Sequence, residues 1–162
     1  MLPDGREIFR SGIGELEIAT LNGKIISCTF SDLYSSMGLE ANAVTAEACR
    51  QLKGYFYGDL KSFDLPLEYD GTDLQLKVMK MLELIPYGIT MSYGEMAKKL
   101  EVPSGSQAVG NLIGKNPLLI LIPCHRVLGK NGKITGYSGG PDRKLWLLQH
   151  ELKFSHKPGT LF

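Results

Sequence analysis

Three side chains that could act together in catalysis are consecutive in the sequence: Cys124, His125 and Arg126. They follow the apolar run 118–123, whose last residue is proline, so a buried strand or extended segment should end at the thiol. A free thiol has a pKa of about 8.5, and a nearby basic or cationic group lowers it toward the nucleophilic thiolate. Because adjacent side chains seldom face each other, we expect a water-mediated link from His125 to Cys124. The stretch predicts a nucleophilic cysteine.

A histidine that activates a thiol needs a carboxylate to orient it. We assign this role to Glu151, because it lies on the predicted last helix, residues 141–154, whose apolar side chains must pack on the core. The second half of the chain has four other acidic residues: Glu83, Glu95, Glu101 and Asp142.

Other roles for these residues remain open from their types and spacing alone. One cysteine and three scattered histidines do not have the spacing of a structural zinc site, so we predict no metal site. A cysteine peptidase would need His150 or His156 to approach the thiol through the fold. A lone cysteine is often purely structural, and Cys28 and Cys49 are assigned to this class because both lie on apolar faces of predicted elements.

Cysteine usage and length restrict the class of protein. Three cysteines without a recognisable secretion signal do not indicate a disulfide framework, and no apolar run approaches the roughly 20 residues of a membrane helix. The chain has 162 residues, 43% of them hydrophobic, which suffices for one large domain or two small ones. We expect a soluble cytoplasmic protein without membrane contact.

The charge is distributed unevenly along the chain. Residues 1–73 contain 6 Lys and Arg against 12 Asp and Glu, and residues 74–162 contain 12 against 5. The net charges of the two parts are therefore −6 and +7. This asymmetry favours a polyanionic partner for the second part. Solvated faces that differ in charge without a partner are the alternative.

The first part of the chain has the pattern of a small sheet with a helix. Alternating residues on both sides of Asn22 and Gly23 predict a β-hairpin over 15–30, because this pair is favoured in two-residue turns. Residues 43–57 carry apolar side chains at helical spacing, and a short strand is expected at 63–68.

A linker-like stretch, YDGTD, places the domain boundary at Gly71. The predicted fold class is α+β, with a small α/β domain containing an antiparallel sheet at residues 1–71 and a mostly helical domain at 72–162. Helices of the second domain are expected at about 74–84, 92–100, 106–114 and 141–154.

The two middle helices of the second domain make a helix-turn-helix candidate. The second of them contains small residues, Ala108 and Gly110, where a major-groove recognition helix would carry long polar side chains. Small residues permit close approach and favour the minor groove, with Gln107 or Ile113 as a wedge. Tight packing between helices, without DNA, is the alternative.

Five short motifs occur in the second part of the chain: SYGEMA at 92–97, AVGN at 108–111, IPCHRV at 122–127, YSGG at 137–140 and WLLQHE at 146–151. Over about residues 70–152 these motifs closely resemble the O6-alkylguanine-DNA alkyltransferases in order and spacing. For the first 70 residues, the predicted hairpin and helix are compatible with the variable N-terminal domain of this family.

The resemblance implies a DNA repair protein that transfers the alkyl group of O6-alkylguanine irreversibly to Cys124. O4-alkylthymine is a second candidate substrate. The reaction would follow minor-groove binding and base flipping and would occur once per molecule, as a stoichiometric methylated-DNA–protein-cysteine S-methyltransferase. The resemblance further implies no cofactor, a monomer acting on double-stranded DNA that contains alkylated guanine, a ribonuclease H-like first domain and a winged helix-turn-helix in the second.

Catalytic roles also follow from the resemblance. The family's hydrogen-bonded chain of glutamate, histidine, water and cysteine corresponds to Glu151, His125 and Cys124. Tyr93 corresponds to the tyrosine that donates a proton toward the leaving guanine. Asn116 corresponds to an asparagine that braces the active-site turn.

Binding roles follow in the same way. Substrate-binding residues would be Val127, Tyr137, Ser138 and Ile113, with Tyr137 forming a wall of the base pocket. DNA-binding residues would be Gln107, Ala108, Gly110, Lys115 and Arg126.

The sequence departs from the family at one consequential position. Gln107 stands where the family usually has an arginine that enters the duplex in place of the flipped nucleotide. Two other functions remain as alternatives: a non-catalytic protein that binds alkylated bases, which would lack the reactive cysteine, and an ordinary helix-turn-helix regulator.

Overall fold

The computed structural model describes residues 2–31, 40–103 and 105–156. The described chain up to Tyr69 forms one compact unit, and Asp70–Ser155 form another. The division lies close to Gly71, where the sequence placed the domain boundary. The fold is α+β, as predicted. No helix in the described ranges combines the length and the apolar composition that crossing a bilayer requires.

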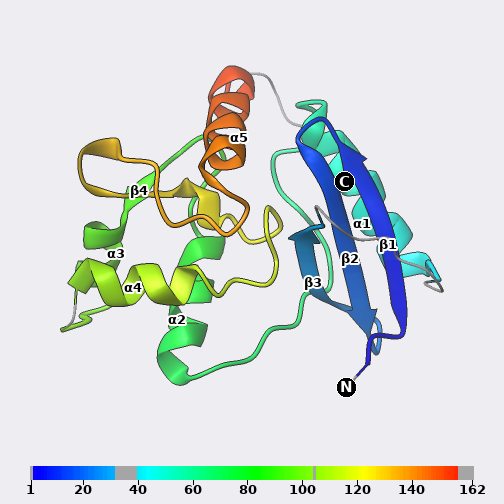
Figure 1. Cartoon of the computed structure of the whole chain (residues 1–162), viewed down its shortest axis with the longest axis horizontal. Coiled ribbons are helices and arrows are strands. Elements are labelled where there is room, and N and C mark those ends of the chain that lie inside the picture. The colour runs from blue at the N-terminus through cyan, green and yellow to red at the C-terminus, as the bar shows by residue number, and fades with distance from the viewer. Residues whose placement is uncertain (1, 32–39, 104, 157–162) are drawn as a thin grey trace. The chain divides into compact units, whose positions relative to one another are not determined.

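The first unit contains a three-stranded antiparallel sheet in the order β1-β2-β3, made of Gly5–Ser11, Gly14–Leu21 and Lys24–Phe30 (Figure 1). Strands β2 and β3 are the predicted hairpin. Leu21 pairs with Lys24, and the two turn residues Asn22 and Gly23 have φ angles of 52° and 76°. A type I′ turn needs positive φ at both positions, which explains why this pair gave a correct prediction.

Helix α1, Ala43–Phe56, packs against this sheet (Figure 1). Its first residues are fixed by Asn42, whose side chain accepts hydrogen bonds from the backbone N–H groups of Val44 and Thr45. The Thr45 hydroxyl accepts the Asn42 N–H in return, at 2.9 Å. This reciprocal capping begins the helix at Ala43. The helix predicted at 43–57 is confirmed.

The prediction for the rest of this sheet was partly wrong. Strand β1 was not predicted, and the strand expected at 63–68 is only a single bridge between Ile25 and Leu67. The carbonyl of Pro66 accepts the Ile25 N–H at 2.7 Å, but Pro66 has no N–H of its own with which to extend a ladder.

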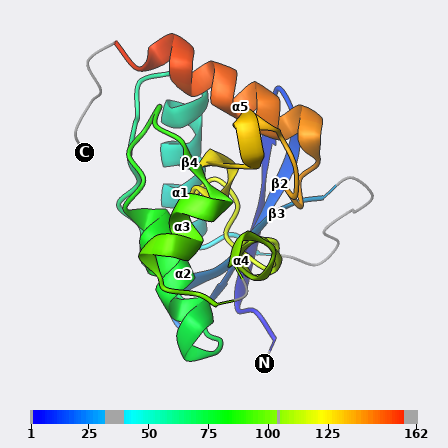
Figure 2. The same cartoon turned by 90° about the vertical axis from the view of Figure 1, so that its left-hand side faces the viewer.

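The second unit contains the four helices that the sequence predicted: α2 (Asp73–Glu83), α3 (Tyr93–Lys99), α4 (Gly105–Ile113) and α5 (Pro141–Phe154). The side chain of Ser92 caps α3 by accepting the Glu95 N–H at 3.0 Å. Helices α3 and α4 pack against each other (Figure 2). A pair of two-residue strands, β4 (Met91–Ser92) and β5 (Val127–Leu128), lies parallel in the same unit.

The apolar run 118–123 is buried, but it is not the strand or extended segment expected. Ile120 has a φ of 70°, which interrupts an extended backbone, and only Leu119 and Ile122 pair, in an isolated bridge. The run therefore forms a compact loop just before Cys124. Its side chains are buried while its backbone turns.

Candidate active site

Cys124 is the first residue of a short 3₁₀ turn, Cys124–Arg126, and only 3% of it is exposed. Its backbone N–H donates to the Ile122 carbonyl at 2.8 Å. The buried Asn116 side chain holds the same loop, since its Nδ2 donates to the Ile122 carbonyl at 3.0 Å and its Oδ1 accepts the Leu118 N–H at 2.9 Å. Asn116 thus fixes the backbone that carries the thiol.

Burial raises the pKa of the Cys124 thiol to about 11, although a hydrogen bond with Asn116 and the charge of Lys144 act in the opposite direction. At neutral pH the sulfur is therefore a protonated thiol at rest. A reaction at this sulfur needs a base that removes the proton when an electrophile arrives.

The candidate for such a base is the fully buried His125, whose Nε2 lies 2.5 Å from Oε2 of Glu151. Burial, together with the charges of Arg126 and Lys144, lowers the pKa of His125 despite the opposing effect of Glu151, so the imidazole is neutral at rest. With Nε2 donating to the carboxylate, Nδ1 carries a lone pair. This Nδ1 is buried and has no hydrogen-bond partner among the described residues. The imidazole therefore keeps one nitrogen available as a proton acceptor.

Two neighbours, His125 and Arg126, keep the Glu151 side chain ionised. Burial by itself would raise its pKa, but the interactions with His125 and Arg126 outweigh burial and hold the pKa well below its usual range. Oε1 accepts the Arg126 Nε–H at 2.7 Å and the Gly88 backbone N–H at 3.1 Å. Every oxygen of this buried carboxylate is hydrogen-bonded, which is the condition for burying a charge stably.

Arg126 has a position that differs from the DNA contact expected for it. It is 7% exposed, its guanidinium pairs with Glu151, and its Nη1 donates to the Ile85 carbonyl at 2.6 Å. The guanidinium also lies over the Tyr87 ring, 5.6 Å from the centroid. Its charge is therefore engaged inside the protein instead of being presented to a phosphate.

A second buried cation, Lys144, contacts Tyr93. Nζ of Lys144 donates to the carbonyls of Val127 at 2.5 Å and Thr135 at 2.8 Å, and it lies 3.3 Å from the Tyr93 hydroxyl. The Tyr93 hydroxyl donates to the Thr135 carbonyl at 2.9 Å. Burial lowers the pKa of Lys144 to about 8, with the charge of Cys124 acting in the opposite direction, and burial raises the pKa of Tyr93.

Lys144 was not predicted from the sequence, although a signal existed. Lys144 and Glu151 are seven residues apart on α5, which places them on one helix face, and the fully buried Leu147 lies between them. A lysine in phase with an apolar core position and with the catalytic carboxylate candidate indicates a buried cation near the site.

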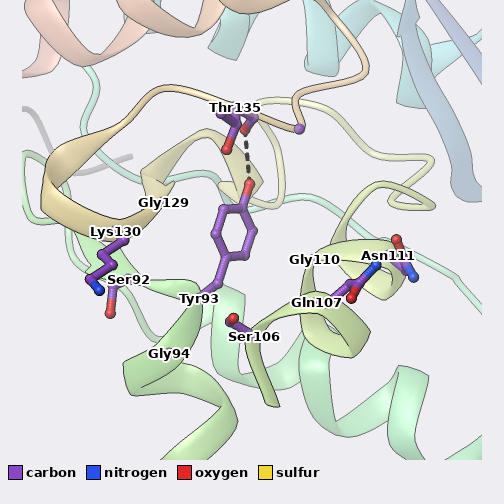
Figure 3. Close-up of a pocket in the computed structure, with 11 residues that line it drawn as sticks. Ser92, Tyr93, Gly94, Ser106, Gln107, Gly110, Asn111, Gly129, Lys130 and Thr135 are labelled. Carbon is purple, nitrogen blue, oxygen red and sulfur yellow. Dashed lines mark hydrogen bonds between the residues drawn. The ribbon is translucent and has the colours of Figure 1, made fainter. Parts of the chain in front are cut away.

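Tyr93 also borders a pocket of about 510 Å³ (Figure 3). Gln107 and Gly110 of α4 line it, as does Gly136, whose φ is 69°. A Cβ atom at Gly136 would lie 3.0 Å from the Tyr93 hydroxyl, so glycine permits the close approach of this loop. Gln107 and Gly110, both predicted to bind DNA, therefore lie at the pocket that contains Tyr93.

The remaining predicted residues occupy varied positions. Val127 and Tyr137 are buried. The ring centroids of Tyr137 and His125 lie 6.5 Å apart, and the two ring planes make an angle of 80°. Ser138 is exposed. Ile113 is 2% exposed, so it packs in the core of the unit and does not project as a wedge.

On α4 and just after it, Ala108 is partly exposed and Lys115 is exposed, as side chains that meet DNA must be. Within the described ranges, no group of three or more His, Cys, Asp or Glu side chains could hold a metal ion.

Comparison with known proteins gives a consistent result. The protein-family model described as "6-O-methylguanine DNA methyltransferase, DNA binding domain" matches residues 73–153. The chain is 48% identical over 117 residues to the methylated-DNA–protein-cysteine methyltransferase of Mycolicibacterium paratuberculosis, covering 72% of this chain and 71% of that protein. It is 52% identical over 105 residues to the protein of the same name from Methanosarcina acetivorans, covering 65% and 67%.

Solved structures agree with these relatives. The crystal structure of Mycobacterium tuberculosis O6-methylguanine methyltransferase superposes with a TM-score of 0.84 at 37% identity, covering 95% of this chain and 96% of that one. A structure of the Mycobacterium tuberculosis OGT in complex with DNA gives a TM-score of 0.84 at 39% identity, covering 93% and 94%. The chain therefore belongs to the methylated-DNA–protein-cysteine methyltransferase family.

Proposed function

We propose that this protein repairs DNA by transferring the alkyl group of O6-alkylguanine to Sγ of Cys124. The sulfur attacks the alkyl carbon, a C–S bond forms, and the bond between that carbon and guanine O6 breaks. Guanine departs with the bonding electrons and takes up a proton. The thioether on Cys124 is stable, so each molecule reacts once. The observation that carries the proposal is the buried Cys124 beside the His125–Glu151 pair, in a member of this family.

Activation of the thiol starts from the neutral state of His125. A water molecule between Cys124 and Nδ1 would relay the thiol proton to the imidazole, which is supported by the buried Nδ1 without a partner among the described residues. The resulting imidazolium is stabilised by Glu151, whose Oε2 is 2.5 Å from Nε2. General-base assistance of this kind contributes about 10²- to 10⁴-fold in rate. It suits a thiol whose pKa is about 11.

Tyr93 is the proposed donor for the leaving guanine. Its raised pKa keeps the hydroxyl protonated at neutral pH, so a proton is available. Nζ of Lys144, 3.3 Å from this hydroxyl, would stabilise the phenolate that forms when the proton leaves. The donor and its stabilising cation thus lie together beside the pocket.

Access to Cys124 requires a flipped nucleotide. Only 3% of Cys124 is exposed, and guanine O6 is enclosed in a stacked duplex, so the base must leave the stack at a cost of a few kcal/mol. We assign minor-groove contact to α4, whose Ala108 and Gly110 permit a close approach. Gln107, exposed at the pocket, would fill the space that the base leaves.

The proposal is tested by incubating the protein with a duplex that contains O6-methylguanine and measuring the intact mass of the protein. We expect a gain of one methyl group, located on Cys124 by peptide mapping, with unmodified guanine left in the DNA. Cys124→Ala is the control and should show no gain. Binding to the lesion without any mass gain would reject transfer and identify a damage-binding protein.

A further inference from the structure

Two amide side chains of α4 lie at the pocket beside Tyr93. Gln107 and Asn111 are four residues apart, one helical turn, and both line this pocket with Gly110 between them (Figure 3). Both are exposed, and neither side chain hydrogen-bonds to another residue in the described ranges. The donors and acceptors of both amides are therefore free for a ligand.

The charge of the pocket lining limits what these amides do. Lys130 is the single cationic residue among the residues that line the pocket, and none of them is acidic. A neutral amide adds little to the attraction of phosphate, which is carried by cations. What it contributes is direction, because it presents one acceptor and two donors in a fixed plane.

That arrangement matches the minor-groove edge of guanine. Guanine offers the N3 acceptor beside the N2 amino donor, so one amide can form two bonds with it, whereas an A·T pair offers acceptors only. Residues one turn apart on a helix have Cβ atoms about 6 Å apart, which allows two amides to reach neighbouring base pairs stacked about 3.4 Å apart.

We propose that Gln107 and Asn111 read the minor-groove edges of the base pairs beside the lesion and favour G·C neighbours. The inference rests on the proposed function, because it requires α4 to enter the minor groove. Gln107 and Asn111 would then help to determine which lesions are repaired fastest. Gln107 would also occupy the space in the stack that the flipped base leaves. The chemistry at Cys124 does not depend on it.

The test compares repair rates in three duplexes that differ only in the pairs flanking O6-methylguanine: G·C, hypoxanthine·C and A·T. Hypoxanthine lacks the N2 amino group and otherwise keeps the shape of guanine. With protein below saturation, we expect the methyl-transfer rate with G·C neighbours to exceed that with hypoxanthine·C by about three- to tenfold, the range for one lost bond of a bidentate pair. The A·T duplex should resemble hypoxanthine·C.

The variants Asn111→Leu and Gln107→Met keep side-chain size but remove the amides. The double variant should repair all three duplexes at similar rates. A second double variant, with alanine at positions 107 and 111, repeats the test without the larger side chains. Lys115→Ala is the matched control, which should slow repair of every duplex by one common factor and preserve the ratio.

A wild type without a G·C preference, or a double variant that keeps the preference, overturns the inference. Failure of the proposed function is distinct, since it would appear as no methyl transfer to the wild type from any of the three duplexes.

Discussion

His125 and Arg126, adjacent in the chain, both hydrogen-bond to the single buried carboxylate of Glu151. His125 Nε2 lies 2.5 Å from Oε2, and Arg126 Nε lies 2.7 Å from Oε1. The arginine neutralises the carboxylate at rest, so the imidazole need not be protonated to balance its charge. The carboxylate is nevertheless in place when His125 accepts a proton. One acidic residue thus orients the proposed base and anchors the turn that carries Cys124.

Replacing Cys124 by Ala should abolish methyl transfer while DNA affinity changes little, because the proposed groove contacts come from α4. Intact mass after incubation with O6-methylguanine DNA measures the first, and a gel-shift titration measures the second. The fully buried Cys28 offers a matched control: Cys28→Ala should lower the free energy of unfolding by about 1 kcal/mol and leave transfer by the folded protein unchanged. Residual transfer by Cys124→Ala would show that another atom is the acceptor.

Replacing Glu151 by Gln should slow transfer more than it weakens DNA binding, because the imidazolium of His125 loses its counter-charge. It should also lower the free energy of unfolding by about 3–5 kcal/mol, since the guanidinium of Arg126 is left buried without its counter-charge. Single-turnover rates and urea unfolding measure the two effects. Equal losses in rate and DNA affinity would indicate a structural role alone.

The same variant gives a test in acid. The pKa of Glu151 is well below its usual range in the folded protein and about 4.3 in an unfolded chain. Its stabilising contribution is therefore complete above about pH 5 and is lost as pH falls toward the folded value. Between pH 5 and 3, the free energy of unfolding of the wild type should fall more steeply than that of Glu151→Gln. Parallel curves would contradict the lowered pKa.

Replacing Arg126 by Gln should raise the pKa of His125, because a neighbouring positive charge that lowers it is removed. Of the other charged groups at this imidazole, Glu151 raises its pKa and Lys144 lowers it. Transfer should then lose rate at a higher pH than in the wild type as acid is added, since a protonated imidazole accepts no proton. Rates measured from pH 5 to 9 test this. A uniform loss of DNA affinity with an unshifted profile would instead support the phosphate contact.

Replacing Lys144 by Met removes the cation beside Tyr93 while keeping the length of the side chain. Transfer should slow about tenfold, because the phenolate formed by proton donation loses its neighbouring charge. This loss is smaller than the about 10²- to 10⁴-fold expected when the acid-base group itself is removed. The loss should be similar for duplex DNA and free O6-benzylguanine, since both need the donor. A loss confined to duplex DNA would place Lys144 in DNA binding instead.

Replacing Gln107 by Arg should speed repair in duplex DNA and affect free O6-benzylguanine little. An arginine can fill the vacated stack and offer a charge to nearby phosphates, whereas glutamine is shorter and neutral. Unstacking costs a few kcal/mol, so recovering about 1.4 kcal/mol would change the rate about tenfold. Equal effects on the two substrates would refute this role of residue 107.

Sequence alone predicted the elements whose ends carry strong local signals. Asn22-Gly23 specified the hairpin, and Pro141 began α5 at the residue expected. The sequence could not predict that residues 118–123 turn at Ile120, because an apolar run has the same composition in a strand as in a buried loop. Strand β1 was also missed, although it pairs along its whole length with β2.

At the site, the pairing of His125 with Glu151 was predicted from the helix that carries the carboxylate, and the structure shows this contact. The nucleophilic role of Cys124 stays a proposal. The pairing of Arg126 with Glu151 instead of with DNA could not be predicted, because an arginine next to a reactive thiol is equally suited to a phosphate. Arg126 and Glu151 are 25 residues apart in the sequence, and they come into contact only in the folded chain. Which partner a long side chain meets is decided by tertiary packing.

The enclosed sulfur has a consequence for the protein between encounters with DNA. Oxidation by peroxide proceeds through an accessible thiolate, and Cys124 is neither accessible nor ionised at rest. Under the proposed single-turnover reaction, a molecule that loses this thiol to oxidation is lost to repair. Burial therefore protects the thiol from oxidation between encounters with DNA.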